Sequence, residues 1–467
     1  MVEIAVTQDN LHLISSDLAN HYKVIPKGES DNGLELFVDE NQNNGEVKDE
    51  LELLLGKEIS FFSCSNTAIE KALSLYYRKD RGGVVSKSLN IDKNDFLENL
   101  LYEAKSLKSS DIHFEIYEAS ARIRFRIDGQ LIERYKVEKD NYLELVNKVK
   151  IKSKLNITEK RLPQDGRITN ESFDIRVSVL PTLYGEKIVM RLLSQDASNI
   201  DLSTLGLKSE ELEVYLEAVK KPNGIILISG PTGSGKTTTL YATLRLLNDN
   251  HRNIVTVEDP IEYTLKGINQ VQLKEDIGLT FASALRSFLR QDPVIIMLGE
   301  IRDPETAMMA IRASLTGHLV LSTIHTNSAV GTISRIIDMG IPSYLIAETL
   351  NLSVAQRLVR KLCDDCKKET EINADDFPMN FSIPYPIEKH YKPAGCNKCY
   401  HTGYKGRTAI YEVLNVDAKT ANAIKNNAIV ELVENNKEYK TLSDKAFDIF
   451  AKGETSLEEI YSILINI

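Results

Sequence analysis

A glycine-rich segment of eight residues, Gly230 to Thr237, carries the residue types that bind phosphate groups. It fits the pattern G-x-x-x-x-G-K-[ST], in which backbone N–H groups converge on the phosphates of a nucleotide. In this pattern Lys236 brings positive charge to the β- and γ-phosphates, and the Thr237 hydroxyl is a ligand of Mg²⁺. The segment follows an apolar run and opens a helical one, which is the context the pattern requires. The residues expected to contact ATP are Gly230, Pro231, Thr232, Gly233, Ser234, Gly235, Lys236, Thr237 and Thr238.

Acidic side chains follow two other apolar runs of the same region. Glu258 and Asp259 come after the run 253–257, and Glu300 comes after the run 294–298. Hydrolysis of ATP needs a positioned water and a metal ion, and carboxylates at strand ends beside a phosphate loop serve both needs. We expect Glu300 to polarise the attacking water. Glu258 and Asp259 would hold the water shell of the metal or the sugar, or else serve as turn and capping acids.

A histidine closes a further apolar run. His325 stands at the end of the run 318–324, where an imidazole can reach a γ-phosphate and respond to its loss. His318, at the start of the same run, is expected to pack or to form a hydrogen bond instead. The two histidines therefore have different predicted roles.

Four of the five cysteines form two Cys-x-x-Cys pairs, Cys363 with Cys366 and Cys396 with Cys399. Four thiolates at this spacing favour a tetrahedral zinc ion in a closed, structural site. The spacer between the pairs contains prolines that interrupt a continuous helix, so we expect an excursion pinned at its base by the metal. Cys64 stands alone and is expected to be a core residue.

The composition indicates a folded, water-soluble protein. The chain has 467 residues, of which 42% are hydrophobic and 27% charged, and its length suggests roughly three domains. A net charge of −10 argues against a general nucleic-acid coat or a polybasic membrane binder, because both need excess cations. No apolar run approaches the ~20 residues that span a bilayer, and the N-terminal residues lack a signal-peptide pattern. We therefore expect a cytoplasmic protein in a reducing compartment.

The elements that must position these residues can be read from the hydrophobic pattern. Apolar runs at 224–230, 253–257, 294–298 and 318–324 are separated by helical spacing, which predicts a parallel sheet covered on both faces. Ligands of such sheets bind at the carboxyl ends of the strands. Upstream, a helical period from Phe96 to Ala104 precedes a region rich in hairpins, with strand candidates at 111–117, 121–127, 172–179 and 186–192 and an Asp128-Gly129 step.

Several motifs occur in one order along the chain. The phosphate loop is followed by 257–262 (VEDPIE), 290–293 (RQDP), 299–303 (GEIRD) and 314–327 (SLTGHLVLSTIHTN), and 160–168 and 110–114 precede it. Together they resemble the type II secretion and type IV pilus assembly ATPases, the traffic ATPase family, and most closely its secretion branch. In that family the stretches are called Walker A, Asp box, Walker B and His box.

The resemblance implies an α/β fold with a RecA-like P-loop NTPase domain and a preceding PAS-like α+β domain. A small N-terminal α+β domain and a tetracysteine zinc module complete the implied architecture. The boundaries we predict are a partner-docking domain at 1–82, the PAS-like domain at 92–196, the RecA-like domain at 203–360, the metal module at 361–410 and a helical region at 411–467.

The resemblance also gives roles to arginines. By motif position, Arg176 and Arg191 look like the arginines that the family sends from the second domain toward the γ-phosphate. Closure of that domain would then couple ATP hydrolysis to motion. Four more resemble family arginines near the nucleotide or the subunit interface, namely Arg286, Arg290, Arg302 and Arg407.

What the resemblance implies about function is a cytoplasmic, ATP-hydrolysing motor that works as a homohexamer and powers assembly of a type II secretion pseudopilus. Its expected ligands are ATP, Mg²⁺ and Zn²⁺. Its expected partners are a polytopic platform protein and the cytoplasmic domain of a platform protein of the inner membrane, the latter reached through residues 1–90. These residues lack the Arg-Leu-Gly-type repeats that mark cyclic-di-GMP-binding N-terminal domains, so control by that messenger is not expected.

Four alternatives to secretion are weighed at the level of sequence. Type IV pilus extension and a DNA-uptake pseudopilus share every catalytic motif with secretion. A nucleic-acid translocase also uses a P-loop, but the acidic composition and the cysteine pairs weigh against it, and no direct binding of nucleic acid is expected. A catalytically inactive scaffold would need to lose Lys236 or Glu300, and both are present.

Overall fold

The structure is a computed structural model with all side chains. It describes residues 10, 13–14, 16–30, 33–39, 44–66, 68–69, 72–73, 87–88, 96–170, 173–194, 201–372, 376–387, 389–436 and 438–465. Its contacts divide the chain into one compact unit of residues 1–85 with the short segment 400–402, and a second that comprises the remainder. Each unit is described by itself.

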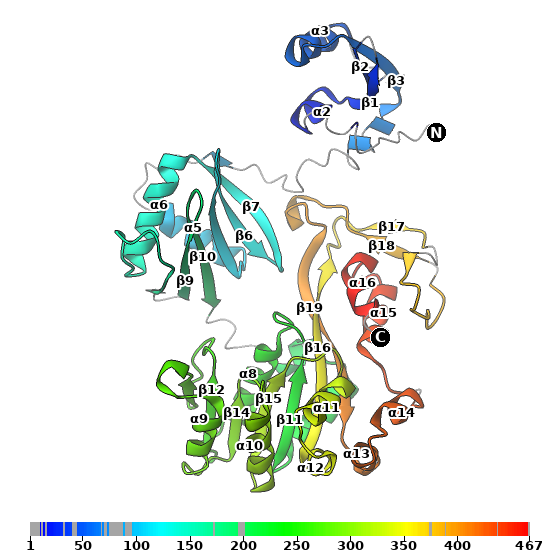
Figure 1. Cartoon of the computed structure of the whole chain (residues 1–467). Coiled ribbons are helices and arrows are strands. Elements are labelled where there is room, and N and C mark those ends of the chain that lie inside the picture. The colour runs from blue at the N-terminus through cyan, green and yellow to red at the C-terminus, as the bar shows by residue number, and fades with distance from the viewer. Residues whose placement is uncertain are drawn as a thin grey trace. The chain divides into compact units, whose positions relative to one another are not determined.

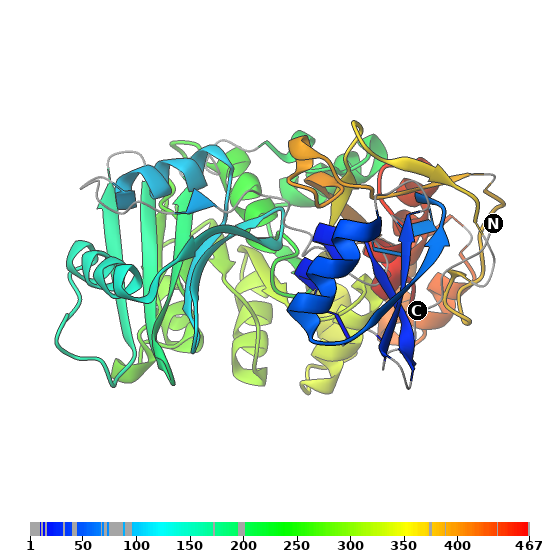
Figure 2. The ribbon, with the colours of Figure 1, turned by 90° about the horizontal axis from the view of Figure 1, so that it is seen from above.

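The first unit is a small α+β fold. Strand β1 (Ile25–Ser30) pairs antiparallel with β2 (Gly33–Asp39), which pairs in parallel with β3 (Ile59–Cys64). Helices α2 (Ser16–Tyr22) and α3 (Asn44–Leu55) lie on one side of this sheet, as the view from above in Figure 2 also shows. Aliphatic side chains fill the space between helices and sheet, and half-buried Cys64 packs against them.

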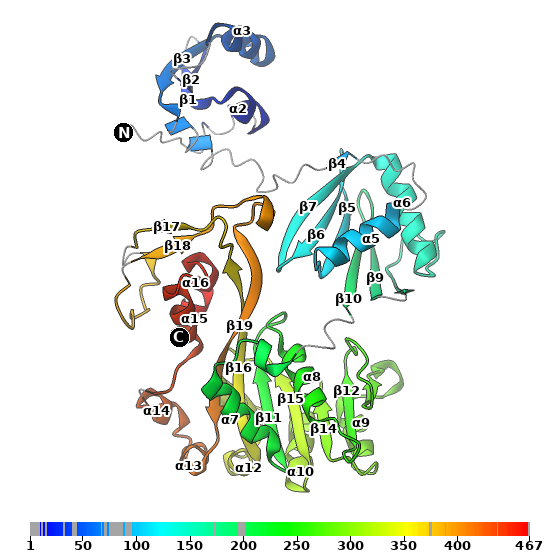
Figure 3. The ribbon, with the colours of Figure 1, turned by 180° about the vertical axis from the view of Figure 1, so that it is seen from behind.

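The second unit begins with a seven-stranded, mostly antiparallel sheet. Its strands lie in the order β4-β7-β6-β5-β10-β9-β8. Helices α5 (Phe96–Ser106) and α6 (Lys139–Lys152) lie on the same side of it in Figure 3, and their buried residues face the apolar side of the sheet. The strands are β4 (Lys87–Ser88), β5 (Asp111–Ile116), β6 (Ala121–Ile127), β7 (Gln130–Val137), β8 (Gln164–Asn170), β9 (Phe173–Thr182) and β10 (Gly185–Ser194).

Alternation along β6 explains why this sheet has one apolar and one charged face. Its odd-numbered residues are fully buried, whereas Arg122, Arg124 and Arg126 are half-buried on the other face. The turn that follows, Asp128-Gly129, has φ of 49° and 86°, which is the left-handed pair that a two-residue hairpin requires. The Asp-Gly step predicted from sequence is therefore a hairpin turn.

The phosphate loop belongs to a second seven-stranded sheet, in the order β13-β12-β14-β15-β11-β16-β19. Every neighbouring pair is parallel except β16 with β19. The predicted parallel sheet is confirmed, and each of the four predicted strands matches an observed one to within about one residue at each end. The strands are β11 (Gly224–Ser229), β12 (Ile254–Glu258), β13 (Asn269–Gln272), β14 (Ile295–Leu298), β15 (Leu319–Ile324), β16 (Leu350–Leu362) and β19 (Tyr404–Asn415).

Helices cover both faces of this sheet. Figure 1 shows α9, α10, α11 and α12 in front of the strands, and Figure 3 shows α7 and α8 on the opposite side. The central strands are buried along their whole length, as a sheet covered on two sides requires. The helices are α7 (Ser209–Lys220), α8 (Lys236–Leu247), α9 (Phe281–Phe288), α10 (Pro304–Leu315), α11 (Ala329–Asp338) and α12 (Ser343–Thr349).

The remaining elements follow or interrupt this sheet. A two-stranded ribbon of β17 (Lys368–Thr370) and β18 (His390–Lys392) lies in the excursion between β16 and β19. Four helices then end the described chain: α13 (Ala418–Lys425), α14 (Ile429–Glu434), α15 (Leu442–Ala451) and α16 (Leu457–Ile465). Among the described residues, none of the helices has the length and apolar character needed to cross a bilayer.

Candidate active site and metal centre

Parallel pairing brings the predicted site residues to one edge of the sheet. In register, Val257 pairs with Leu298, Leu298 with Ser322, and Ser229 with Ile324. The segments that follow β12, β14, β15 and β11 therefore leave the sheet side by side. These segments carry the Asp box, Walker B, the His box and the phosphate loop.

The phosphate loop has the backbone that its glycines predict. Gly230, Gly233 and Gly235 all have positive φ. A Cβ on Gly230 would lie 2.5 Å from the Gln356 carbonyl oxygen and 2.6 Å from Ser234 Oγ, so only glycine fits there. Within the part of the chain that the structure describes, the buried Ser234 hydroxyl has no hydrogen-bond partner, which leaves it available to a ligand in the loop.

Lys236 is folded back onto this loop. Its Nζ donates to the carbonyl oxygens of Gly230 at 2.7 Å and Pro231 at 3.1 Å. Burial lowers the pKa of Lys236, the charge of Glu300 raises it, and the charge of Arg357 lowers it again. The Lys236 amine has these two carbonyl partners among the described residues, and it lies beside glycine N–H groups and the half-buried Thr237. This arrangement fits the polyphosphate and Mg²⁺ of a nucleotide.

Glu300 is held rigidly from both sides. The flanking residues bond to neighbouring strands, Gly299 N to Val257 O at 2.8 Å and Ile301 N to Thr323 O at 2.9 Å. Its side chain is 15% exposed and lies close enough to Lys236 for the two charges to interact. This carboxylate therefore points to the phosphate loop from a fixed backbone, as a group that orients water must.

Two predicted partners contact this carboxylate. His325 Nε2 lies 3.2 Å from Glu300 Oε2, and Arg302 Nη2 lies 2.5 Å from Glu300 Oε1. The hydrogen bond to Glu300 raises the pKa of Arg302, whose other terminal nitrogen lies 3.9 Å from Asp259 Oδ2. The structure thus brings Glu300, His325, Arg302 and Asp259 together. His318 is elsewhere, with Nδ1 2.8 Å from the Ala313 carbonyl oxygen.

Glu258 is placed differently from Glu300. It is 3% exposed and accepts hydrogen bonds from Thr256 Oγ1 at 2.6 Å, from Gln270 Nε2 at 3.0 Å and from the Tyr241 hydroxyl. Burial and then the charge of Glu258 raise the pKa of Tyr241, so the phenol stays protonated and donates. The Asp box is thereby linked to α8, the helix that follows the phosphate loop. Sequence patterns did not reveal Tyr241 or Gln270.

The two arginines predicted to reach the γ-phosphate stand next to each other. Arg176 on β9 and Arg191 on β10 are opposite in register, on the charged face of the first sheet. Arg191 Nε pairs with Asp111 Oδ1 at 3.2 Å and its side chain is 59% exposed. Arg176 pairs with Glu262 at 3.6 Å and donates to the carbonyl oxygen of Ile261, both in the Asp box.

The other predicted arginines lie apart from the Glu300 group. Arg286 pairs with Glu305, and Arg290 Nη1 donates to the Arg286 carbonyl oxygen at 3.0 Å. Arg407, near the start of β19, lies 3.8 Å from Asp128 Oδ1. All three are surface cations in the single chain, and the structure does not join them to the phosphate loop.

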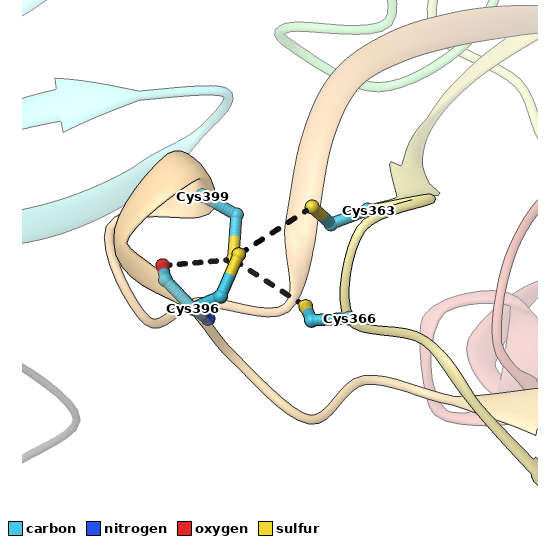
Figure 4. A group of neighbouring side chains, drawn as sticks. All are labelled: Cys363, Cys366, Cys396 and Cys399. Carbon is cyan, nitrogen blue, oxygen red and sulfur yellow. Dashed lines mark hydrogen bonds between the residues drawn. The ribbon is translucent and has the colours of Figure 1, made fainter.

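The four paired cysteines form one cluster. Their sulfur atoms all lie within 4.8 Å of one another, and they face each other in Figure 4. Cys363 Sγ is 3.9 Å from Cys396 Sγ, and Cys366 Sγ is 3.7 Å from Cys399 Sγ. Zn–S bonds of about 2.3 Å in a regular tetrahedron put the sulfurs about 3.8 Å apart. The donor set and its spacing therefore fit a zinc ion, and none of the four is in a disulfide.

Comparisons with known proteins identify the family of the chain. Residues 90–462 match the model of the family described as type II/IV secretion system protein. The chain belongs to this family. Residues 3–83 match the MshEN domain. That match does not test the expectation about cyclic di-GMP, which stays a prediction.

Individual relatives support the assignment to the family. The chain is 46% identical over 370 residues to the type II secretion system ATPase E of Vibrio cholerae, covering 78% of this chain and 74% of that protein. It is 42% identical over 443 residues to the type IV pilus assembly ATPase PilB of Myxococcus xanthus, covering 88% of this chain and 78% of that protein. The chain is therefore an ATPase of the secretion and pilus-assembly family, as the motifs predicted.

Solved structures of the family have the same fold. The pilus retraction motor PilT with bound ADP is 27% identical, with a TM-score of 0.55 over 79% of this chain and 97% of that one. The ATPase DotB of Legionella pneumophila gives a TM-score of 0.59 over 81% of this chain and 99% of that one, at 23% identity. The mixed α/β architecture predicted from sequence is thus confirmed.

Proposed function

We propose that this chain is the motor of a type II secretion pseudopilus and that it hydrolyses ATP at the edge of the sheet formed by β12, β14, β15 and β11. The observation that carries the proposal is the placement of Glu300 between His325 and Arg302, facing the charge of Lys236. A carboxylate fixed beside a phosphate loop is the arrangement that water-mediated phosphoryl transfer needs.

Residues of the phosphate loop and of the neighbouring strand ends share the work of ATP hydrolysis. The N–H groups of the phosphate loop and the Lys236 amine bind the β- and γ-phosphates, and Thr237 Oγ1 would be a ligand of bound Mg²⁺. Bound Mg²⁺ would neutralise charge on the phosphate oxygens. Glu300 orients the attacking water and accepts its proton. The water oxygen forms a bond to the γ-phosphorus, the bond from the γ-phosphorus to the β–γ bridging oxygen breaks, and ADP and phosphate leave. His325 contacts the γ-phosphate and responds to its loss.

Further roles extend this scheme to the rest of the site. Glu258 and Asp259 order the water shell of the metal or the sugar. Arg176 and Arg191 bring guanidinium charge toward the γ-phosphate when the sheet of β4–β10 closes on the sheet that carries the phosphate loop. This closure would couple hydrolysis to motion. Four more arginines lie near the nucleotide or at the boundary between subunits in this scheme: Arg286, Arg290, Arg302 and Arg407.

The proposed assembly is a homohexamer in which the two sheets belong to a PAS-like domain (92–196) and a RecA-like domain (203–360). Residues 1–82 form the docking domain, and residues 1–90 reach the cytoplasmic domain of a platform protein of the inner membrane. A polytopic platform protein is the second partner. The chain thus works at the cytoplasmic face of that membrane. The module at 361–410 holds one structural zinc ion. The region at 411–467 completes the subunit; it begins with the last residues of β19, and its four described helices follow them.

Type IV pilus extension is a second candidate because a PilB protein is 42% identical to this chain; a DNA-uptake pseudopilus would use the same machinery. A strain that lacks the chain's gene separates these candidates. Loss of secreted proteins from the medium, restored by the wild-type chain and not by Lys236→Ala, supports secretion. Loss of surface pili or of DNA uptake with normal secretion favours the second reading. Stimulation of ATP hydrolysis by DNA would instead support a nucleic-acid translocase.

A further inference from the structure

Arg357, on β16, is a cation of the nucleotide site that the motifs do not include. Its Nη2 donates to Asn327 Oδ1 at 3.1 Å and lies 3.4 Å from the Asn327 carbonyl oxygen. Its Nη1 donates to the Gln356 carbonyl oxygen at 3.1 Å. Asn327 is the last residue of the His box, two positions after His325. The guanidinium therefore joins the loop after β15 to strand β16.

The same guanidinium also lies beside Gly230 of the phosphate loop. A Cβ on Gly230 would lie 3.2 Å from Arg357 Nη1, so this glycine leaves the space that the guanidinium uses. The adjacent Gln356 points to α8, where its Oε1 accepts from Thr239 Oγ1 at 2.9 Å. Strand β16 thus has two contacts around the nucleotide site: Gln356 binds to α8, and Arg357 binds to the loop after β15.

No carboxylate neutralises this cation within the described residues at ion-pair distance. Arg357 is half-buried, and burial lowers its pKa while the charge of Glu412 raises it by a smaller amount. Burying an unpaired guanidinium costs free energy that hydrogen bonds to neutral oxygens repay only in part. A packing role alone is a poor explanation of this cost, since an uncharged side chain would fill the same space.

His325 depends on its loop for its position. Its side chain is 51% exposed, and Glu300 is its contact among the described residues. Ser328 caps α11 by accepting from Gly331 N, which fixes the far end of the loop. The near end is fixed by β15, which ends at Ile324, directly before His325. The link from Arg357 to Asn327 adds a side-chain anchor next to Ser328, and a displaced catalytic group can cost about 100-fold in rate.

We propose that Arg357 is a positioning residue that ties the His-box loop to the phosphate loop through Asn327 and so keeps His325 on Glu300. It acts on the turnover of bound ATP and contributes little to the binding of ADP. This inference rests on the ATPase activity of the family and on the role proposed for His325.

The test is a double-mutant cycle on the full chain. Arg357→Gln and Asn327→Ala should each lower kcat by about 10- to 100-fold. In both variants, the KM for ATP and the Kd for a fluorescent ADP analogue should change by less than about threefold. The kcat of the double variant should be no lower than that of the weaker single variant. In the His325→Ala background, neither change has a further effect. Arg357→Lys should have a kcat between those of the wild type and Arg357→Gln. The lysine keeps the positive charge, but its ammonium cannot form the forked contact with Asn327.

Two results would overturn the proposal. A large rise in the Kd for the ADP analogue would mean that Arg357 binds phosphate directly. Multiplicative losses in the double variant, or a full loss in the His325→Ala background, would mean that it acts independently of the loop. Asn327 is exposed, so Asn327→Ala tests the link even where Arg357→Gln unfolds. Lys220→Ala, an exposed cation on α7, is the control for charge removal, with unchanged kcat expected.

Discussion

His325 Nε2 lies 3.2 Å from Glu300 Oε2, although the two residues come from different strand ends. The opposite oxygen of the same carboxylate faces Arg302 at 2.5 Å. Each Glu300 oxygen is thus engaged by one nitrogen group, and the carboxylate is close enough to Lys236 for the two charges to interact. A carboxylate held this way has a defined orientation before any nucleotide binds, which reduces the reorganisation needed for catalysis.

Replacement of Glu300 tests its role as the group that orients water. Glu300→Gln keeps the shape of the side chain but removes its negative charge and basicity, so we expect ATP turnover to fall by about 10²–10⁴-fold. Binding of ATP should persist, because Lys236 and the loop N–H groups are intact. Phosphate release and binding of a fluorescent ATP analogue measure the two effects.

The control for this experiment is Lys236→Ala, for which we expect loss of nucleotide affinity together with loss of turnover. Unchanged turnover in Glu300→Gln would remove Glu300 from its proposed role. Comparable loss of ATP binding in both variants would assign Glu300 to binding and not to the chemical step.

The cysteine cluster predicts a metal content. Protein purified without chelators should contain about one zinc ion per chain by elemental analysis, and Cys399→Ser should lower this value and the melting temperature together. Cys64→Ser is the matched control, because Cys64 lies outside the cluster and should leave zinc unchanged. A zinc content near zero in the wild-type chain would contradict the assignment.

The carboxylate of Glu115, on β5, predicts that acid lowers the stability of the sheet formed by β4–β10. Burial by itself raises its pKa, but hydrogen bonds from Arg124 and Arg122 outweigh burial and lower the pKa from 4.5 to about 2. A depressed folded-state pKa gives stability that is complete above the unfolded-state pKa and is lost as the pH falls through the folded-state value. We therefore expect β5 and β6 to lose protection from hydrogen exchange between about pH 5 and pH 2.

The comparison variant is Glu115→Gln, which removes the titrating group. Its sheet should be less stable at pH 7, and the fall in protection with acid should be shallower than in the wild-type chain. An acid profile identical in the two proteins would show that Glu115 does not govern this transition.

A buried ion pair joins α6 to β10, and we expect its disruption to lower the stability of the protein strongly. Lys150 is fully buried, and its Nζ lies 2.6 Å from Glu186 Oε1 and 2.7 Å from the Glu159 carbonyl oxygen. Glu186→Ala leaves the ammonium buried without its carboxylate, so unfolding should become easier by about 3–5 kcal/mol. Urea denaturation monitored by hydrogen exchange in α6 measures this.

Removing both charges separates the ion pair from packing. Lys150→Met combined with Glu186→Leu should recover most of the stability, because apolar residues of similar volume replace a buried pair at little cost. A double variant as unstable as Glu186→Ala would assign the loss to packing and not to the unpaired charge.

The sequence predicted the parts of the site that depend on local patterns. The glycines of the phosphate loop, the four central strands and the Asp128-Gly129 turn each follow from short-range rules, and each appears in the structure. Glu300 and His325 were found because acidic and imidazole groups at strand ends are informative wherever strands are parallel.

Features that depend on pairing between distant segments could not be predicted in the same way. Strand β8 (Gln164–Asn170) is polar and short of β-branched residues, and it is a strand because β9 pairs with it. Tyr241 and Arg357 lie within a helical run and a long strand, where an isolated polar residue carries no motif. Their contacts with Glu258 and Asn327 arise only when β12, β15 and β16 have joined one sheet, in which β14 separates β12 from β15 and β11 separates β15 from β16.

The antiparallel pairing of β16 with β19 has a consequence for how the cysteine module can vary. Leu362 and Tyr404 are partners in register, so the two ends of the excursion between them are neighbours in the sheet. Each doubling of the length of such a closed loop costs only about 0.6 kcal/mol in entropy. Loop closure therefore sets almost no limit on the length of the excursion, and the nucleotide-binding sheet can keep its register while that length varies.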